Sequence, residues 1–159
     1  MIDGFEFASA GAKQQGVLPL GGFSRLRDML ASDAGSVAYA VHGVRDGRGR
    51  PSLRVSVQGT LQLRCQRCLE ALPFEVDCDE LLVLAASQSE IDADPTDAQA
   101  PDRVITGKEM PVRDLIEDEL ILALPYAPRH ESCVERSATG ESAKTSPFAG
   151  LRSLMRGGN

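Results

Sequence analysis

The feature that most constrains this fold is a two-residue alternation that runs from Leu53 to Cys65. Apolar side chains hold the odd positions, apart from Gly59, and polar side chains hold the even ones. Successive side chains of a β-strand point to opposite faces, so one face of this strand lies on a core and the other is polar. Gly59, in the middle of the run, predicts a bulge or bend.

Flanking segments extend this strand into a sheet. Residues 36–42 also alternate, and a turn-forming Asp-Gly-Arg-Gly-Arg segment at 46–50 separates the two runs. This pattern predicts a β-hairpin. A further strand begins at Phe74 and continues through residues 81–84, and an antiparallel meander is the economical arrangement for the three strands.

Shorter patterns predict the remaining elements. Phe5 and Phe7 have the spacing of a short strand, and apolar residues in 23–30 fall at helical spacing. Pro111 opens a second helix, and Pro125 ends it. The predicted class is therefore α+β, with an antiparallel β-meander or hairpin sheet, two short helices packed on it and a flexible C-terminal tail.

The 159 residues suit one domain with a tail. Residues 1–133 form the predicted α+β domain, in which residues 86–102 are an acidic surface loop. Residues 134–159 form a flexible polar linker followed by a short amphipathic tail helix. The apolar tail side chains are candidates for partner binding, with folding back onto the domain as the alternative: Phe148, Leu151 and Leu154.

Apolar stretches, the start of the chain and the cysteines indicate the cellular compartment. No apolar stretch approaches the roughly 20 residues needed to cross a bilayer, and the start of the chain lacks the basic and apolar pattern of an export signal. The 4 cysteines do not form a disulfide framework at this length, which favours reduced thiols or metal ligands. We expect a cytoplasmic protein with no membrane partner.

The first candidate site is a C-x-x-C motif formed by Cys65 and Cys68. His130 and Cys133 form a second pair with the same spacing, so the four residues could provide a Cys₃His zinc site. Two alternatives stay open. Cys65 could be a small buried core residue, as we expect for Cys78, or the motif could be a redox pair.

The second candidate site is a group of arginines, accompanied between residues 45 and 67 by the single acid Asp46. Arginine forks suit phosphate groups, so this strip is a candidate RNA-binding surface. Its members are Arg45, Arg48, Arg50, Arg54, Arg64 and Arg67. The alternative is an ordinary solvated sheet face.

Acidic residues gather on the predicted second helix: Asp114, Glu117, Asp118 and Glu119. Negative charge near a helix N-terminus is favoured by the helix dipole, so a solvated face is the simpler interpretation. Docking of a basic partner protein is the alternative. No candidate nucleophile accompanies these carboxylates, and we expect no enzyme activity.

Three segments carry a resemblance to a known family. They are residues 63–70, then 114–125 with 128–133, and finally 146–154. In this order they resemble the YceD-like family of large ribosomal RNA subunit accumulation proteins. The resemblance implies a role in the synthesis, processing or stability of 23S rRNA, with no catalytic residues.

The leading hypothesis is a non-enzymatic ribosome-biogenesis factor that binds precursor rRNA or an assembling large subunit. The alternative is a zinc-stabilised interaction adaptor that acts on a ribosomal protein or a processing enzyme and affects rRNA indirectly.

Overall fold

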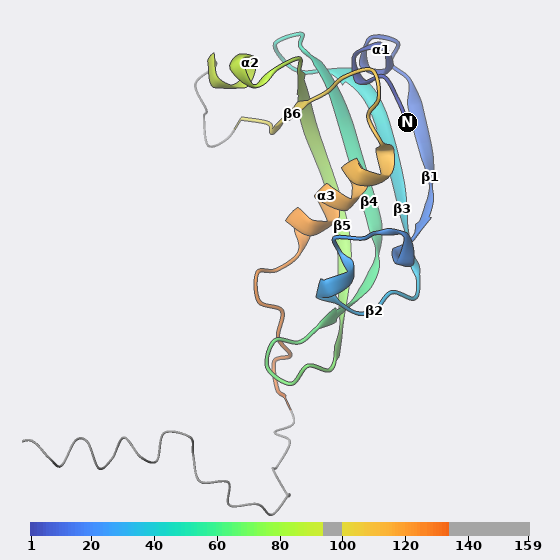
Figure 1. Ribbon diagram of the computed structural model, residues 1–159, viewed down its shortest axis with the longest axis vertical. Helices are drawn as coiled ribbons and strands as arrows, with labels where there is room; N and C mark the ends of the chain where they lie inside the picture. The colour runs from blue at the N-terminus through green and yellow to red at the C-terminus, as the bar shows by residue number, and fades with distance from the viewer. Residues whose placement is uncertain (94–99, 134–159) are drawn as a thin grey trace, which may run out of the picture.

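The computed structural model describes residues 1–93 and 100–133, which form one sheet with helices on one of its faces (Figure 1). The strands are β1 (Lys13–Pro19), β2 (Leu30–Ser32), β3 (Ser36–Arg45), β4 (Pro51–Arg64), β5 (Ala71–Ala85) and β6 (Arg103–Ile105). The α-helices are α1 (Gly4–Ser9), α2 (Gln88–Ala93) and α3 (Val112–Ala123), and two 3₁₀ turns are η1 (Leu20–Gly22) and η2 (Arg27–Met29). No helix in these ranges is long and apolar enough to span a membrane.

The sheet has the order β1-β3-β4-β5-β6, with β2 paired to β4. The predicted hairpin of β3 and β4 and its antiparallel continuation into β5 are confirmed. The simple meander is only part of the architecture, however. The short strand β6 pairs with β5 in parallel, and β1, which the sequence did not predict, adds to β3.

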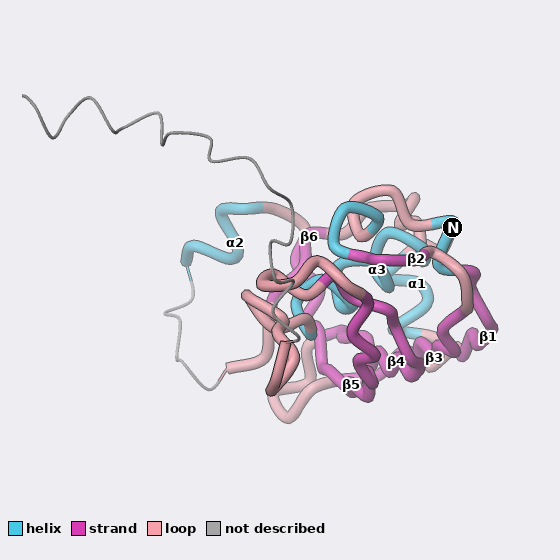
Figure 2. Tube along the Cα trace, turned by 90° about the horizontal axis from the view of Figure 1, so that it is seen from below, coloured by secondary structure: helices cyan, strands magenta, loops and turns pink. Residues whose placement is uncertain are grey.

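The alternation in β4 has the predicted structural consequence. Its odd-numbered side chains point toward the helices and are fully buried at Leu53, Val55 and Leu61, whereas Arg54 lies exposed on the opposite face. Helix α3 packs on this apolar face through Ile116 and Leu120. Each such side chain contributes about 1.5–3 kcal/mol when it is removed from water. Figure 2 shows α1, α3 and β2 on the same side of the sheet.

Gly59 does not mark a bulge, because the register with β5 runs through it without a shift, and its pairing with Val37 is the last pair between β4 and β3. A Cβ atom at this position would lie 2.8 Å from Cγ1 of Val37. The glycine is therefore required by the close approach of β3.

Two other predictions near the N-terminus are wrong. Phe5 and Phe7 lie in helix α1, which begins after Asp3; the side chain of Asp3 accepts a hydrogen bond from the main-chain N–H of Glu6 at 3.0 Å. Residues 23–30 contain only the turn η2 and the start of β2 in place of an amphipathic helix.

A distant carboxylate explains why residues 23–30 do not form the predicted helix. Oε1 of Glu117 accepts the main-chain N–H groups of Arg25 at 2.6 Å and Leu26 at 3.0 Å, and Oε2 accepts from Nε of Arg25 at 3.1 Å. Burial alone would raise the pKa of Glu117, but these hydrogen bonds hold it below its ordinary value. Glu117 and Glu119 are both buried, so the expectation of a wholly solvated acidic face on α3 is also wrong.

The segment at 86–102 is not simply a loop, since it includes helix α2. Pro111 is the residue that precedes α3, and the helix ends at Ala123, just before Pro125. The predicted tail helix with Phe148, Leu151 and Leu154 lies outside the described residues, as does the predicted linker.

Candidate metal centre

A tight turn between β4 and β5 carries the first cysteine pair. The main-chain N–H of Cys65 donates to the oxygen of Glu70 at 3.0 Å, and that of Leu69 donates to the oxygen of Cys65 at 2.9 Å. Leu69 has a φ of 65°, in the left-handed region that non-glycine residues seldom adopt. The chain reverses at this point, so both cysteines lie on one small loop.

The segment after α3 brings the second pair to the same place. It runs along the sheet from the helix end toward the β4–β5 turn (Figure 1). The main-chain N–H of Gln66 donates to the oxygen of Pro128 at 2.8 Å, which joins the turn to this segment. His130 follows two residues later, and its Nε2 lies 3.0 Å from the main-chain oxygen of Ala71.

The four candidate ligands converge as predicted. Sγ of Cys65 lies 3.6 Å from Sγ of Cys133, and Sγ of Cys68 lies 3.3 Å from Nδ1 of His130. All four ligand atoms lie within 4.8 Å of one another. Tetrahedral zinc with bonds of about 2.3 Å to sulfur and 2.0 Å to nitrogen places ligand atoms about 3.5–3.8 Å apart. The cluster could therefore hold a metal ion, and its donor set suits zinc.

The local electrostatics favour a thiolate at Cys65. Hydrogen bonds from the main chain, first from Cys68 and then from His130 and Arg67, lower its pKa to about 5, although burial opposes the shift. The N–H of Arg67 lies 3.4 Å from the sulfur. Burial, together with the neighbouring thiols Cys65 and Cys68, raises the pKa of Cys133. A metal ion would replace the proton that Cys133 retains, because zinc binds the thiolate.

The remaining thiol stays apart from this centre. Cys78 packs beside the core, its Sγ lies 3.7 Å from the main-chain oxygen of Val57, and burial raises its pKa. The chain after Cys68 enters β5, not a helix, so the pair lacks the helix N-terminus that commonly activates redox thiols.

The arginines of the predicted strip are spread along the whole length of β4. Arg48 and Arg50 lie at the β3–β4 turn, whereas Arg64 and Arg67 lie at the other end of β4. The 14 residues of β4 separate these groups by roughly 45 Å at the usual rise of a strand.

Acidic and main-chain partners hold several members of the strip. Arg54 forms a two-point ion pair with Asp79, at 2.8 and 2.7 Å. Arg50 pairs with Asp46 at 2.8 Å. Arg45 donates to the main-chain oxygen of Gly49 at 3.0 Å. These contacts engage the donors that a phosphate would use.

The family model for large ribosomal RNA subunit accumulation protein YceD matches residues 53–155. The chain belongs to the YceD family. The matched range contains both halves of the candidate metal centre, together with β4 from its third residue onward, β5 and helix α3. The family description connects the protein with the large ribosomal subunit and its RNA. No solved structure matches the chain.

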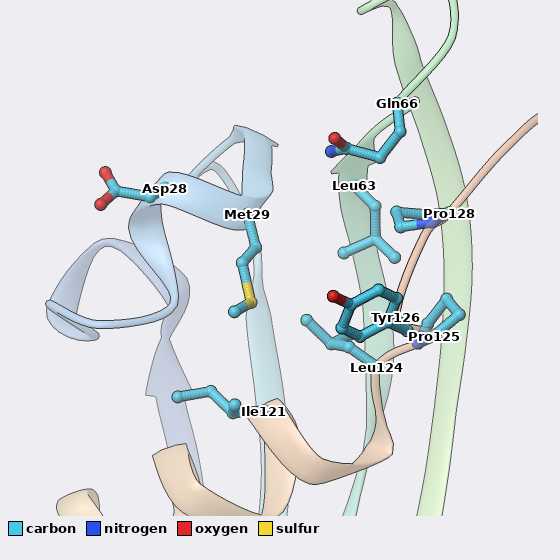
Figure 3. Close-up of a pocket in the computed structure, with 9 residues that line it drawn as sticks. All are labelled: Asp28, Met29, Leu63, Gln66, Ile121, Leu124, Pro125, Tyr126 and Pro128. Carbon is cyan, nitrogen blue, oxygen red and sulfur yellow. The ribbon is translucent and has the colours of Figure 1, made fainter.

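The sequence interpretation missed two features of the YceD-family chain beside the metal centre. Arg129 is exposed next to His130, and an apolar cavity of about 390 Å³ lies where Leu63, Leu124 and Tyr126 face Met29 (Figure 3). Tyr126 is fully exposed at its rim. The Pro-Tyr-Ala-Pro-Arg segment at 125–129 could have predicted these features. Its prolines end the helix, which leaves Tyr126 and Arg129 on the surface.

Proposed function

We propose that this protein is a non-enzymatic, cytoplasmic factor that promotes the synthesis, processing or stability of 23S rRNA by binding precursor rRNA or an assembling large subunit. In this proposal Cys65, Cys68, His130 and Cys133 hold one Zn²⁺, which has a structural role. The observation that carries the proposal is the convergence of these four side chains on a surface turn in a chain of the YceD family.

The metal centre would present basic side chains in a fixed geometry. Arg67 lies between two ligands in the turn, and Arg129 precedes a third ligand. Both are exposed, and within the described residues neither has a side-chain hydrogen bond or ion pair. Unengaged guanidinium groups on a rigid turn can bind phosphate oxygens without first breaking internal ion pairs.

An aromatic side chain is also available at this end. Tyr126 is fully exposed near Gln66, on the rim of the apolar cavity. Aromatic rings stack on unpaired bases, and arginines neutralise the backbone beside them. The proposed RNA surface is therefore the region around the metal centre, with Arg64 beside it; Arg45, Arg48, Arg50 and Arg54 become secondary candidates.

Binding of a large-subunit rRNA fragment at several salt concentrations tests this proposal. We expect the Arg67→Glu and Arg129→Glu double variant to lose at least about tenfold in affinity and to reduce the salt slope by about one unit for each lost phosphate contact. The Arg45→Glu and Arg48→Glu double variant, at the β3–β4 turn, carries the same change of charge; it is the matched control and should change affinity little. Equal losses for both variants, or none, would contradict the assignment.

The second candidate function is a zinc-stabilised adaptor that binds a ribosomal protein or a processing enzyme. The apolar cavity beside the centre favours it, because Met29 is 42% exposed there. Co-sedimentation with precursor particles distinguishes the two functions. An adaptor should stay bound to partner protein after nuclease treatment and lose it in Met29→Asp, whereas an RNA-binding factor should be released by the nuclease.

A further inference from the structure

We propose that the outer edge of β5 is a docking site for an extended, lysine- or arginine-rich protein segment that adds to the sheet as a further strand. The site consists of the segment Glu75–Leu81 with the acidic side chains around it. The proposal goes beyond the RNA contact above and does not depend on it.

The main-chain groups of alternate β5 residues point away from β4. The N–H of Val83 donates to Asp102 at 2.8 Å, and the oxygen of Ala85 accepts from Thr106 at 3.0 Å. At the other end of the strand, the oxygen of Ala71 faces His130. All three β5 residues are odd-numbered, and their groups point away from β4.

Main-chain groups of an antiparallel strand alternate between its two sides. The N–H and C=O groups of the odd-numbered residues from 75 to 81 therefore also point away from β4. Pro73 is also odd-numbered, so its nitrogen points away from β4. A proline at such a position removes no hydrogen bond to β4.

In the part of the chain that the structure describes, no strand lies beside Glu75–Leu81 on the side away from β4. Strand β6 pairs only with Val83–Ala85. Within residues 1–93 and 100–133, no hydrogen bond reaches the outward main-chain groups of Glu75–Leu81. An unpaired edge of this length is a ready template for another strand.

The edge of β5 carries several acidic side chains. Glu75, Asp77 and Asp79 lie on the face of β5 that carries no helix, and all three are exposed. Gln58 contacts Asp77 at 3.0 Å and Arg54 contacts Asp79, but Glu75 has no side-chain hydrogen bond or ion pair in the described part of the chain.

Carboxylates also line the helix-covered side of the same edge. Glu80 lies there opposite the buried Val55. Glu119 of α3 is close enough to Glu80 and Asp102 for their negative charges to raise its pKa. Glu119 is 5% exposed, and none of these three carboxylates has a side-chain hydrogen bond or ion pair within the described ranges. Carboxylates on both faces favour a cationic strand and disfavour a second copy, whose own β5 would oppose acid with acid.

Peptide binding tests the proposal on the full chain. The probe is a labelled peptide of about nine alternating lysines and valines, a length typical of a long strand. Its matched control carries N-methyl groups at alternate residues, which keeps the charge but removes edge hydrogen bonds. We expect at least about tenfold weaker binding of the methylated peptide. Equal binding of the two peptides, or no binding of either, would overturn the proposal.

Amide hydrogen exchange locates the bound strand. The unmodified peptide should slow exchange at Glu75, Asp77, Asp79 and Leu81, and protection elsewhere would overturn the assignment. Glu75→Pro removes one outward N–H while the bonds to β4 remain, so it should weaken binding. Glu80→Gln should weaken it by loss of charge, whereas Asp28→Asn, an exposed acid on η2, should not.

Other occupants give different results. If the chain's own tail covers the edge, these amides are already protected without peptide and become exposed in Phe148→Asp. If a second copy covers it, the protein dimerises and Glu75→Pro makes it monomeric. If large-subunit RNA alone protects these amides, the edge belongs to the RNA surface. Each of these three results overturns the proposal.

Discussion

The Nε2 atom of His130 lies 3.0 Å from the main-chain oxygen of Ala71, while Nδ1 of the same ring faces Sγ of Cys68 at 3.3 Å. A ring N–H donated to a carbonyl fixes the tautomer and leaves the other nitrogen free to bind a metal. The residue that orients the histidine is the first residue of β5, so the candidate metal centre is attached directly to the sheet.

The first prediction concerns metal content. We expect elemental analysis of the purified protein to find about one zinc per chain, because the donor set and spacing suit tetrahedral zinc. Cys65→Ser and Cys133→Ser should each lose the metal. Cys78→Ser is the matched control and should retain it, since Cys78 lies outside the centre. Zinc retained in full after Cys65→Ser and Cys133→Ser are combined would contradict this assignment.

Much of this centre could be predicted from spacing alone. The alternation from Leu53 to Cys65 predicted the strand, and the two pairs with three-residue spacing predicted the ligands. The structure confirms that these pairs meet. The N-terminal helix could also have been predicted, because Asp3 and Glu6 have the spacing of a capping box.

Other parts depend on contacts that no local pattern contains. The apolar residues of 23–30 have helical spacing, yet Glu117, about ninety positions away, binds the main-chain N–H groups of Arg25 and Leu26. The ion pair of Arg54 with Asp79 likewise depends on the register of β4 and β5. A sequence window records charge and periodicity, but it does not record which distant side chain satisfies a given donor.

The second prediction concerns this buried carboxylate. Glu117→Ala should lower the free energy of unfolding by about 2–4 kcal/mol, because it leaves two main-chain donors and Nε of Arg25 without their acceptor. Urea unfolding measures the change. Asp114→Ala, on the exposed side of the same helix, should cost no more than about 0.5 kcal/mol. Similar values for the two variants would argue against a structural role for the Glu117 contacts.

The third prediction concerns the close approach of β3 and β4. Gly59→Ala places a Cβ atom 2.8 Å from Cγ1 of Val37 and 3.2 Å from the main-chain oxygen of Ser36. We expect a loss of about 1–3 kcal/mol in unfolding free energy, as in other overpacked cores. Gly47→Ala is the control, since nothing lies within 4 Å of its added Cβ. An unchanged Gly59→Ala would mean that the strands separate at little cost.

The fourth prediction concerns pH. Burial, followed by the charges of Glu80, Asp102 and Asp118, raises the pKa of Glu119 to about 7 from an ordinary 4.5. A raised pKa in the folded state means that the folded chain holds this proton more tightly than the unfolded chain. The stabilisation is therefore complete below about pH 4.5 and is lost as the pH rises through about 7.

Glu119→Gln removes this titration while it keeps the shape of the side chain. We expect the variant to be more stable than the parent protein by about 1–3 kcal/mol at pH 8, with a difference that shrinks steadily toward pH 5. Urea unfolding at intervals of pH measures both curves. Glu109→Gln, an exposed acid in the segment before α3, is the control and should leave the pH dependence unchanged. A constant offset between parent and Glu119→Gln at every pH would contradict the prediction, because it would mean that Glu119 does not titrate in this range.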